Sequence, residues 1–107
     1  MMGIDLYLTK GNVTIDMGRL HNFVGSSYVI TPDIIKDCLE NLPFEISDIR
    51  TRIMKFSLYR PSSLQDAREY MEDVENNLTY LREKWEQIER LRMLQDLLQQ
   101  GFVASTD

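Results

Sequence analysis

The chain has 107 residues, of which 43% are hydrophobic, and a formal net charge of −5. A chain of this length has room for one small domain, and its apolar content is too high for an intrinsically disordered protein. All of the excess negative charge lies in residues 61–107, which disfavours general nucleic-acid binding through bulk charge.

The N-terminal segment has the pattern of a β-hairpin. Apolar and other residues alternate over residues 4–9 and again over residues 13–17, and the turn-forming segment Lys10-Gly11-Asn12 lies between them. Alternation with a period of two is typical of half-buried strands. Residues 19–24 fit either a short helix or a loop, and residues 28–30 form a short apolar run that is a candidate third strand.

A helix is predicted over residues 32–42. Thr31 is a suitable N-cap, Pro32 is favoured in the first turn, and the charge of Asp33 is favourable at that end of the helix dipole. Pro43 is expected to end this helix. The apolar residues that share its predicted inner face are Ile34, Ile35, Cys38, Leu39 and Leu42.

Residues 44–60 allow two interpretations. The apolar residues Ile46, Ile49, Ile53 and Phe56 have helical spacing, whereas residues 52–59 are rich in β-favouring side chains that alternate with others. The helical spacing of the apolar residues favours a second short helix over residues 47–57.

The C-terminal half predicts one long amphipathic helix over residues 62–100. Pro61 precedes it, Ser62 and Gln65 have the spacing of a capping box, and Gln99-Gln100-Gly101 is a plausible stop. Apolar residues recur at steps of three and four, as in a coiled coil. The residues predicted to form an oligomer interface on this helix are Leu64, Met71, Val74, Leu78, Leu81, Trp85, Ile88 and Leu91.

The predicted length of this helix implies a partner. A helix over residues 62–100 is about 58 Å long, whereas the remaining residues make a globule roughly 25–30 Å across. Such a body is too small to cover the whole apolar stripe, and a second copy of the chain is the commonest cover. The alternative is that the helix bends or breaks near Asn76-Asn77 and packs within its own chain.

The predicted fold class is therefore α+β. We expect an N-terminal β-hairpin or small antiparallel sheet, two short helices, and the long amphipathic helix forming a coiled-coil-like interface. The corresponding divisions are a small α+β domain over residues 1–60, the oligomerisation helix over residues 61–101 and a flexible tail over residues 102–107.

The sequence carries few signals of chemistry. One histidine, His21, and one cysteine, Cys38, are too few for the common zinc sites, and the five glycines are scattered rather than gathered in a phosphate-binding loop. We therefore expect no metal, no cofactor and no enzymatic activity. The lone cysteine and the absence of a long apolar run favour a cytoplasmic protein without a membrane partner.

One stretch resembles winged helix-turn-helix domains. Helix 32–42, the segment Leu42-Pro43-Phe44 and helix 47–57 have the layout of the motif, residues 28–30 precede it, and a dimerising helix follows. The resemblance covers under a third of the chain, without a turn glycine or a wing hairpin. It implies nucleic-acid or anion contacts by Arg50, Arg52 and Lys55 on the second helix.

A second resemblance concerns residues 2–8, Met-Gly-Ile-Asp-Leu-Tyr-Leu, which are similar to the opening of small uncharacterised phage proteins. The leading functional hypothesis is a small non-enzymatic adaptor, or an inhibitor that sequesters another protein, encoded by a phage or mobile element. It is expected to form a homodimer or higher oligomer through the long helix. The alternative is a helix-turn-helix DNA-binding regulator, and an enzyme or nucleotide-binding module assembled between subunits is a third hypothesis.

Overall fold

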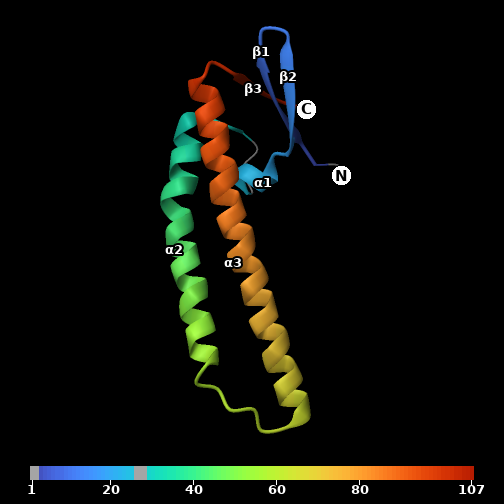
Figure 1. Cartoon of the computed structure of the whole chain (residues 1–107), viewed down its shortest axis with the longest axis vertical. Coiled ribbons are helices and arrows are strands. Elements are labelled where there is room, and N and C mark those ends of the chain that lie inside the picture. Colours follow the sequence, from blue (N-terminus) through green and yellow to red (C-terminus); the bar gives the residue numbers. More distant parts are fainter. Residues whose placement is uncertain (1–2, 26–28) are drawn as a thin grey trace. The chain divides into compact units, whose positions relative to one another are not determined.

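The computed structural model describes residues 3–25 and 29–107. Within these ranges the elements are β1 (Asp5–Lys10), β2 (Val13–Arg19), α1 (His21–Val24), α2 (Pro32–Phe56), α3 (Leu64–Gln99) and β3 (Val103–Thr106), as Figure 1 shows. The predicted α+β class is confirmed, with an antiparallel sheet and a long C-terminal helix. The candidate strand at 28–30 is not formed by Val29 and Ile30, and Tyr28 lies outside the described residues.

The three strands form one sheet in the order β2-β1-β3, and β1 pairs antiparallel with both neighbours. The predicted hairpin is β1 and β2, whose connection contains Gly11 at a φ of 59°. This left-handed conformation favours glycine over residues with a Cβ atom. The alternation read from the sequence places Leu6 and Leu8 on the buried face of β1.

The C-terminal segment is a strand, which corrects the prediction of a flexible tail over residues 102–107. Gly101, at a φ of 101°, ends α3: its N–H donates to the Leu98 carbonyl and the Phe102 N–H donates to the Leu97 carbonyl. This pair of bonds is a Schellman motif, and it reverses the chain toward the sheet. The free edge of β1 then pairs with β3, a contact that no local pattern in the sequence specifies.

Helix α2 begins where the sequence predicts, because the Thr31 hydroxyl accepts a hydrogen bond from the Ile34 N–H at 3.1 Å. It does not end at Pro43. A single helix runs from Pro32 to Phe56 with Pro43 inside it, which corrects the prediction of two short helices separated by a turn. Leu42 precedes the proline, and Ile46 and Ile49 follow it. All three side chains are buried, and their burial offsets the free-energy cost of a proline inside the helix.

Helix α3 is the predicted long helix, with a start that differs in detail from the expected capping box. Ser63, rather than Ser62, accepts the N–H of Asp66, at 3.0 Å, and the Asp66 carboxylate accepts the N–H of Ser62, at 2.8 Å. The predicted capping box of Ser62 and Gln65 is therefore not formed: Ser63 is the cap, and Asp66 accepts from the residue before the cap rather than from the cap itself.

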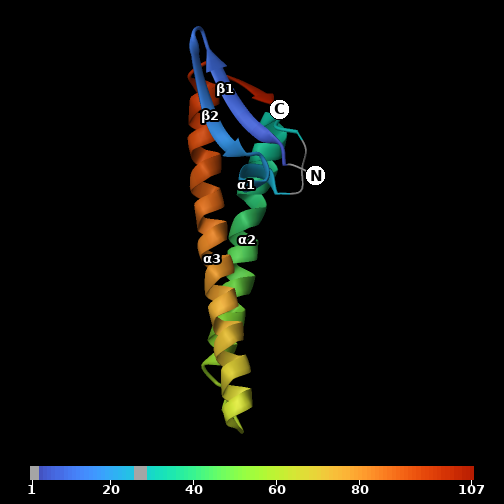
Figure 2. The same ribbon diagram turned by 90° about the vertical axis from the view of Figure 1, so that its right-hand side faces the viewer.

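The described residues fall into two compact units that divide both long helices. The first contains residues Met1–Glu40 and Gln87–Asp107, and the second is the helical hairpin Asn41–Glu86. Figures 1 and 2 show the two arms of this hairpin running side by side in opposite directions. The buried core of the first unit consists of Leu6, Leu8, Leu20, Phe23, Val24, Ile35, Ile88, Leu91 and Leu94.

Candidate functional site

The helical hairpin Asn41–Glu86 buries few of its apolar side chains. All of its residues are described, and only Leu42, Ile46 and Ile49 are buried. Two helices alone cover only one side of each other, so the apolar side chains on their other sides stay exposed. The large hydrophobic residues that the hairpin leaves exposed are Phe44, Met54, Leu58, Tyr59, Leu64, Met71, Leu78, Tyr80 and Trp85.

Four of these exposed residues form one line along α3, which we call the outer column. They are Leu64, Met71, Leu78 and Trp85, with exposed fractions of 70%, 54%, 49% and 43%. Residues seven apart lie on nearly the same side of a helix that has about 3.6 residues per turn. The outer column is therefore a continuous apolar line on the hairpin.

The other residues of the predicted interface face the chain's own core to differing extents. Val74 and Leu81 are half-buried, whereas Ile88 and Leu91 have exposed fractions of 3% and 0%. Ile88 and Leu91 are core residues of the first unit and are not available to a partner. The apolar stripe of the sequence thus consists of two neighbouring lines, one of which packs within the chain. The alternative prediction of a break near Asn76-Asn77 is wrong, because α3 runs without interruption from Leu64 to Gln99.

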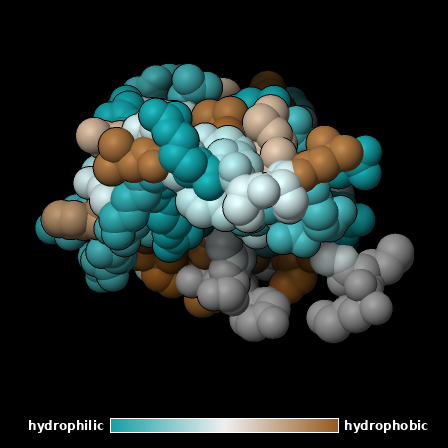
Figure 3. All heavy atoms as spheres, turned by 90° about the horizontal axis from the view of Figure 1, so that it is seen from below, coloured by the Kyte–Doolittle hydropathy of each residue, from teal (hydrophilic) through white to brown (hydrophobic). Residues whose placement is uncertain are grey.

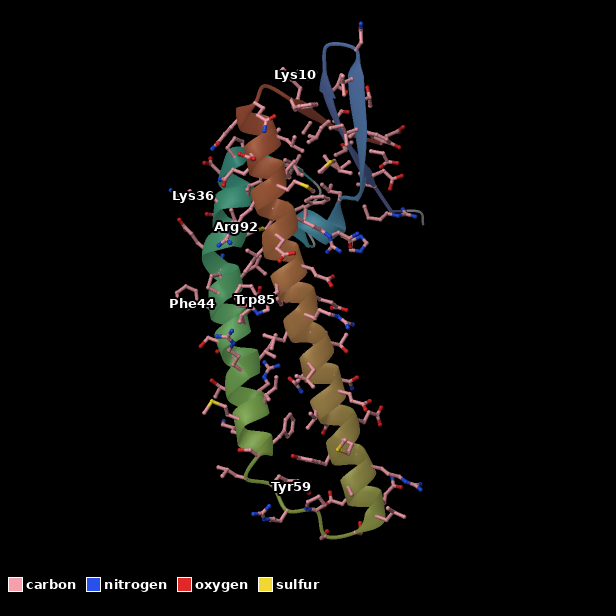
Figure 4. The ribbon with its side chains drawn as sticks, viewed as in Figure 1. Lys10, Lys36, Phe44, Tyr59, Trp85 and Arg92 are labelled. Carbon is pink, nitrogen blue, oxygen red and sulfur yellow. The ribbon has the colours of Figure 1, made fainter. Side chains whose placement is uncertain are left out.

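Trp85 lies at the side of the hairpin, next to α2. The Arg50 guanidinium carbon lies 5.6 Å from the centre of the Trp85 ring, a cation–π arrangement between the two arms. In Figure 4 the labelled Trp85 lies between the two ribbons, and Phe44 points away from α3. Trp85 and Phe44 therefore belong to different faces of the hairpin, and the outer column does not extend to Phe44.

A line of charges runs beside the outer column. Arg68, Glu75 and Arg82 are seven residues apart and exposed, so positive, negative and positive charges follow one another along the helix. Each lies four residues after a member of the outer column, and residues four apart are neighbours on a helix surface. We call this line the charged column. The charged column was not among the predicted site residues, although the seven-residue spacing of its charges is visible in the sequence.

The side of α3 that carries Asp73 combines charged side chains with the exposed Tyr80. Asp73 follows Met71 by two residues, about 200° around the helix, so the two side chains point in nearly opposite directions. On this side the Lys84 ammonium lies 3.6 Å from the Glu45 carboxylate. Separate apolar patches within a mainly hydrophilic surface are visible in Figure 3. The side of α3 with the outer column is therefore the more apolar of the two.

An aromatic cluster closes the loop end of the hairpin. The Tyr59 and Tyr70 rings stack with centres 5.4 Å apart, and Phe56 meets Tyr70 edge-on at 5.7 Å. The Tyr70 hydroxyl donates to the Phe56 carbonyl at 2.8 Å. A shallow pocket of about 260 Å³ adjoins the cluster. It is lined by Phe56, Tyr59, Asp66, Glu69, Tyr70 and Asp73.

A short hydrogen bond links this cluster to the start of α3. The Tyr59 hydroxyl donates to the two Asp66 carboxylate oxygens, at 2.6 and 2.7 Å. The bond lowers the pKa of Asp66, with help from the Ser62 N–H, and the same bond and nearby carboxylates raise the pKa of Tyr59. The bond holds the connection between α2 and α3 in place.

The two pKa shifts predict that the stabilising contribution of this bond is lost at both low and high pH. Asp66 has a lowered folded-state pKa, so its contribution is present above its unfolded value near 3.8 and is lost as the pH falls through the folded value. Tyr59 has a raised folded-state pKa, so its contribution is present below 10.0 and is lost as the pH rises through the folded value.

We expect Asp66→Asn to bring the pKa of Tyr59 back toward 10.0, because the carboxylate that accepts the hydrogen bond of the Tyr59 hydroxyl is removed. The measurement is the phenolate absorbance of the protein during alkaline titration, with Tyr59→Phe identifying the signal of Tyr59. Asp73→Asn is the matched control, since Asp73 lines the same pocket but accepts no hydrogen bond from Tyr59 among those described. An equal shift in both variants would contradict the assignment to the Tyr59–Asp66 bond.

The three basic residues predicted to contact nucleic acid do not form one surface. They lie on the uninterrupted helix α2, and helix occupies the segment where the turn of a helix-turn-helix was predicted. Arg50 and Arg52 are two residues apart and so point about 200° apart. Arg50 lies over the Trp85 ring, while Arg52 and Lys55 are exposed nearer to each other around the helix. The geometry of the winged helix-turn-helix resemblance is therefore not present.

Residues 3–25 and 29–107 contain neither a cluster of metal ligands nor a helix that could cross a membrane. These residues contain no group of three or more histidine, cysteine or acidic side chains arranged to hold a metal ion. Among the same residues, no helix combines the length and apolar character needed to cross a membrane. His21 is exposed at the start of α1, and Cys38 is half-buried on α2.

The geometry of the hairpin is thus the main guide to function, because comparison with protein-family models, with curated proteins and with solved structures finds no match to this chain.

Proposed function

We propose that the protein is a small non-enzymatic interaction protein that self-associates through the outer column of α3. In this proposal two helical hairpins pack together and cover the apolar line that one hairpin leaves in water. The paired hairpins then form the framework of an adaptor, or of a factor that binds and sequesters another protein. The sides of α3 that carry Asp73 remain in solvent, where they are available to such a partner.

One observation carries the proposal: the hairpin buries three apolar side chains and leaves the regular line Leu64, Met71, Leu78 and Trp85 substantially exposed. Together these four side chains expose an apolar area on the order of 400 Å², comparable to the largest apolar patch of a typical monomer, which is often functional. Burying each of them is worth about 1.5–3 kcal/mol when complete. The half-buried Val74 and Leu81 adjoin the line and widen the surface.

We expect the purified protein to have the mass of an oligomer in light scattering, and Leu78→Asp to reduce it to the mass of a monomer. The substitution places a charge in the middle of the apolar line, where a partner would have to bury it. Leu78 is about half exposed in the single chain, so the hairpin itself should tolerate the change. Leu81 is not a suitable site, because its half-buried side chain also packs within the chain.

Asn76→Asp is the matched control, since it adds the same charge at an exposed position about 200° around the helix from Leu78. Its mass should equal that of the parent protein. Circular dichroism of both variants establishes that helix content is kept. A parent protein that is monomeric at high micromolar concentration would contradict the proposed function, and so would a Leu78→Asp variant that keeps the full oligomeric mass.

A further inference from the structure

We infer that the partner at the outer column is a second copy bound antiparallel, with the two-fold axis passing beside Leu78. The inference rests on the proposed function, because it assigns the orientation and register of the same self-association. Three observations carry it: the order of apolar side chains in the outer column, the alternation of charge in the charged column, and the position of that charged column on one side only.

The apolar residues complement one another about Leu78. An axis at this residue places Leu78 against Leu78 of the partner subunit. Met71 precedes the axis by seven residues and Trp85 follows it by seven, so Met71 meets Trp85 of the partner subunit. A methionine sulfur beside an aromatic ring is a favourable contact. Three of the four members of the outer column are then covered, including Trp85, which has the largest side chain, and Leu64 at the end of the line is left without an apolar counterpart.

The charged column independently supports the antiparallel arrangement with the axis beside Leu78. In an antiparallel pair related by a two-fold axis, the same line of residues on each helix lies on the same side of the helix–helix contact. The charged columns of the two copies are therefore adjacent. With the axis beside Leu78, Glu75 lies next to Arg82 of the partner subunit, and symmetry forms the same pair a second time.

Other arrangements lose one of these two features. An axis midway between Met71 and Leu78 pairs all four members of the outer column, but it places Glu75 against the partner's Glu75 and Arg68 beside the partner's Arg82. An axis at Met71 also pairs opposite charges and covers three members of the outer column, but it covers Leu64 in place of Trp85 and so loses the contact between methionine and tryptophan. A parallel pair places the charged columns on opposite sides, where they do not meet. Like charges at close range disfavour the first arrangement, and the loss of the methionine–tryptophan contact disfavours the second.

Single cysteines introduced into a Cys38→Ser background test the orientation. The expected result is that Leu78→Cys forms a disulfide-linked dimer under mild oxidation, because an axis brings the two copies of residue 78 together. In the same arrangement the two copies of residue 71 are about 21 Å apart along the helices, too far for a disulfide. Met71→Cys alone should remain uncrosslinked, whereas Met71→Cys mixed with Trp85→Cys should form the heterodimer.

The outcomes separate this inference from the proposed function. If the parent protein is a monomer, both fail, and the outer column is a surface for a different protein. If the parent is an oligomer but Met71→Cys crosslinks to itself as readily as Leu78→Cys, self-association stands and the antiparallel register is wrong. An oligomeric parent whose Leu78→Cys variant stays uncrosslinked also overturns the register.

Charge reversal provides a second test that leaves the apolar line intact. Glu75→Arg or Arg82→Glu alone replaces two attractive pairs with two repulsive ones and should raise the dissociation constant about tenfold at low salt. The double variant Glu75→Arg with Arg82→Glu restores the pairs and should return the constant close to that of the parent. Both residues are exposed, so the fold should be kept. Additive weakening in the double variant would contradict the register.

Discussion

Replacing Leu91 with alanine should lower the free energy of unfolding by about 2–5 kcal/mol, the cost of removing a large side chain from a packed core. Leu91 has an exposed fraction of 0% and lies on α3 within the first unit. That unit combines a small sheet with helix ends, so its core has few residues that can move to fill a cavity. Urea denaturation followed by circular dichroism measures the change.

Met93→Ala is the control for Leu91→Ala. Met93 lies two residues away on the same helix but is half exposed, so its truncation should change the free energy of unfolding by less than about 1 kcal/mol. The fluorescence of Trp85, the single tryptophan, reports on the second unit in the same experiment. Equal losses for the two variants would mean that Leu91 does not belong to the core described above.

Replacing Pro43 with alanine should stabilise the protein by up to about 3 kcal/mol, because a proline inside a helix removes a backbone hydrogen bond and crowds the preceding turn. Pro43 lies inside α2 and is exposed, so its side chain contributes little burial that would be lost. An alanine N–H at this position can donate to the carbonyl of Leu39. The measurement is the midpoint of thermal unfolding at fixed protein concentration.

Pro61→Ala is the matched control, since Pro61 lies in the connection between α2 and α3, outside both helices. Losing a proline there increases the freedom of the unfolded chain and should leave stability unchanged or lower it slightly. If Pro43→Ala did not raise the melting temperature above that of Pro61→Ala, the prediction that Pro43 destabilises α2 would be wrong.

The amino-acid sequence determined the elements that depend on neighbouring residues. Alternation identified β1 and β2, and the Thr31-Pro32 pair marked the start of α2. The spacing of apolar residues together with Gly101 fixed the extent of α3 to within two residues at each end. These signals are local, because strand alternation, helix capping and helix termination each involve residues a few positions apart.

Only the tertiary structure decided the features that depend on distant residues. Pro43 is a helix breaker by local rules, yet α2 continues through it because Leu42, Ile46 and Ile49 are buried on one face. The last residues form β3 because the edge of β1 is available to pair with them. The same holds for the candidate site: the sequence showed one apolar stripe on α3, and the fold divided it by burying Ile88 and Leu91 and leaving the outer column exposed. The periodicity of a helix shows which residues share a face, but only the packing of the rest of the chain determines which part of that face remains in water.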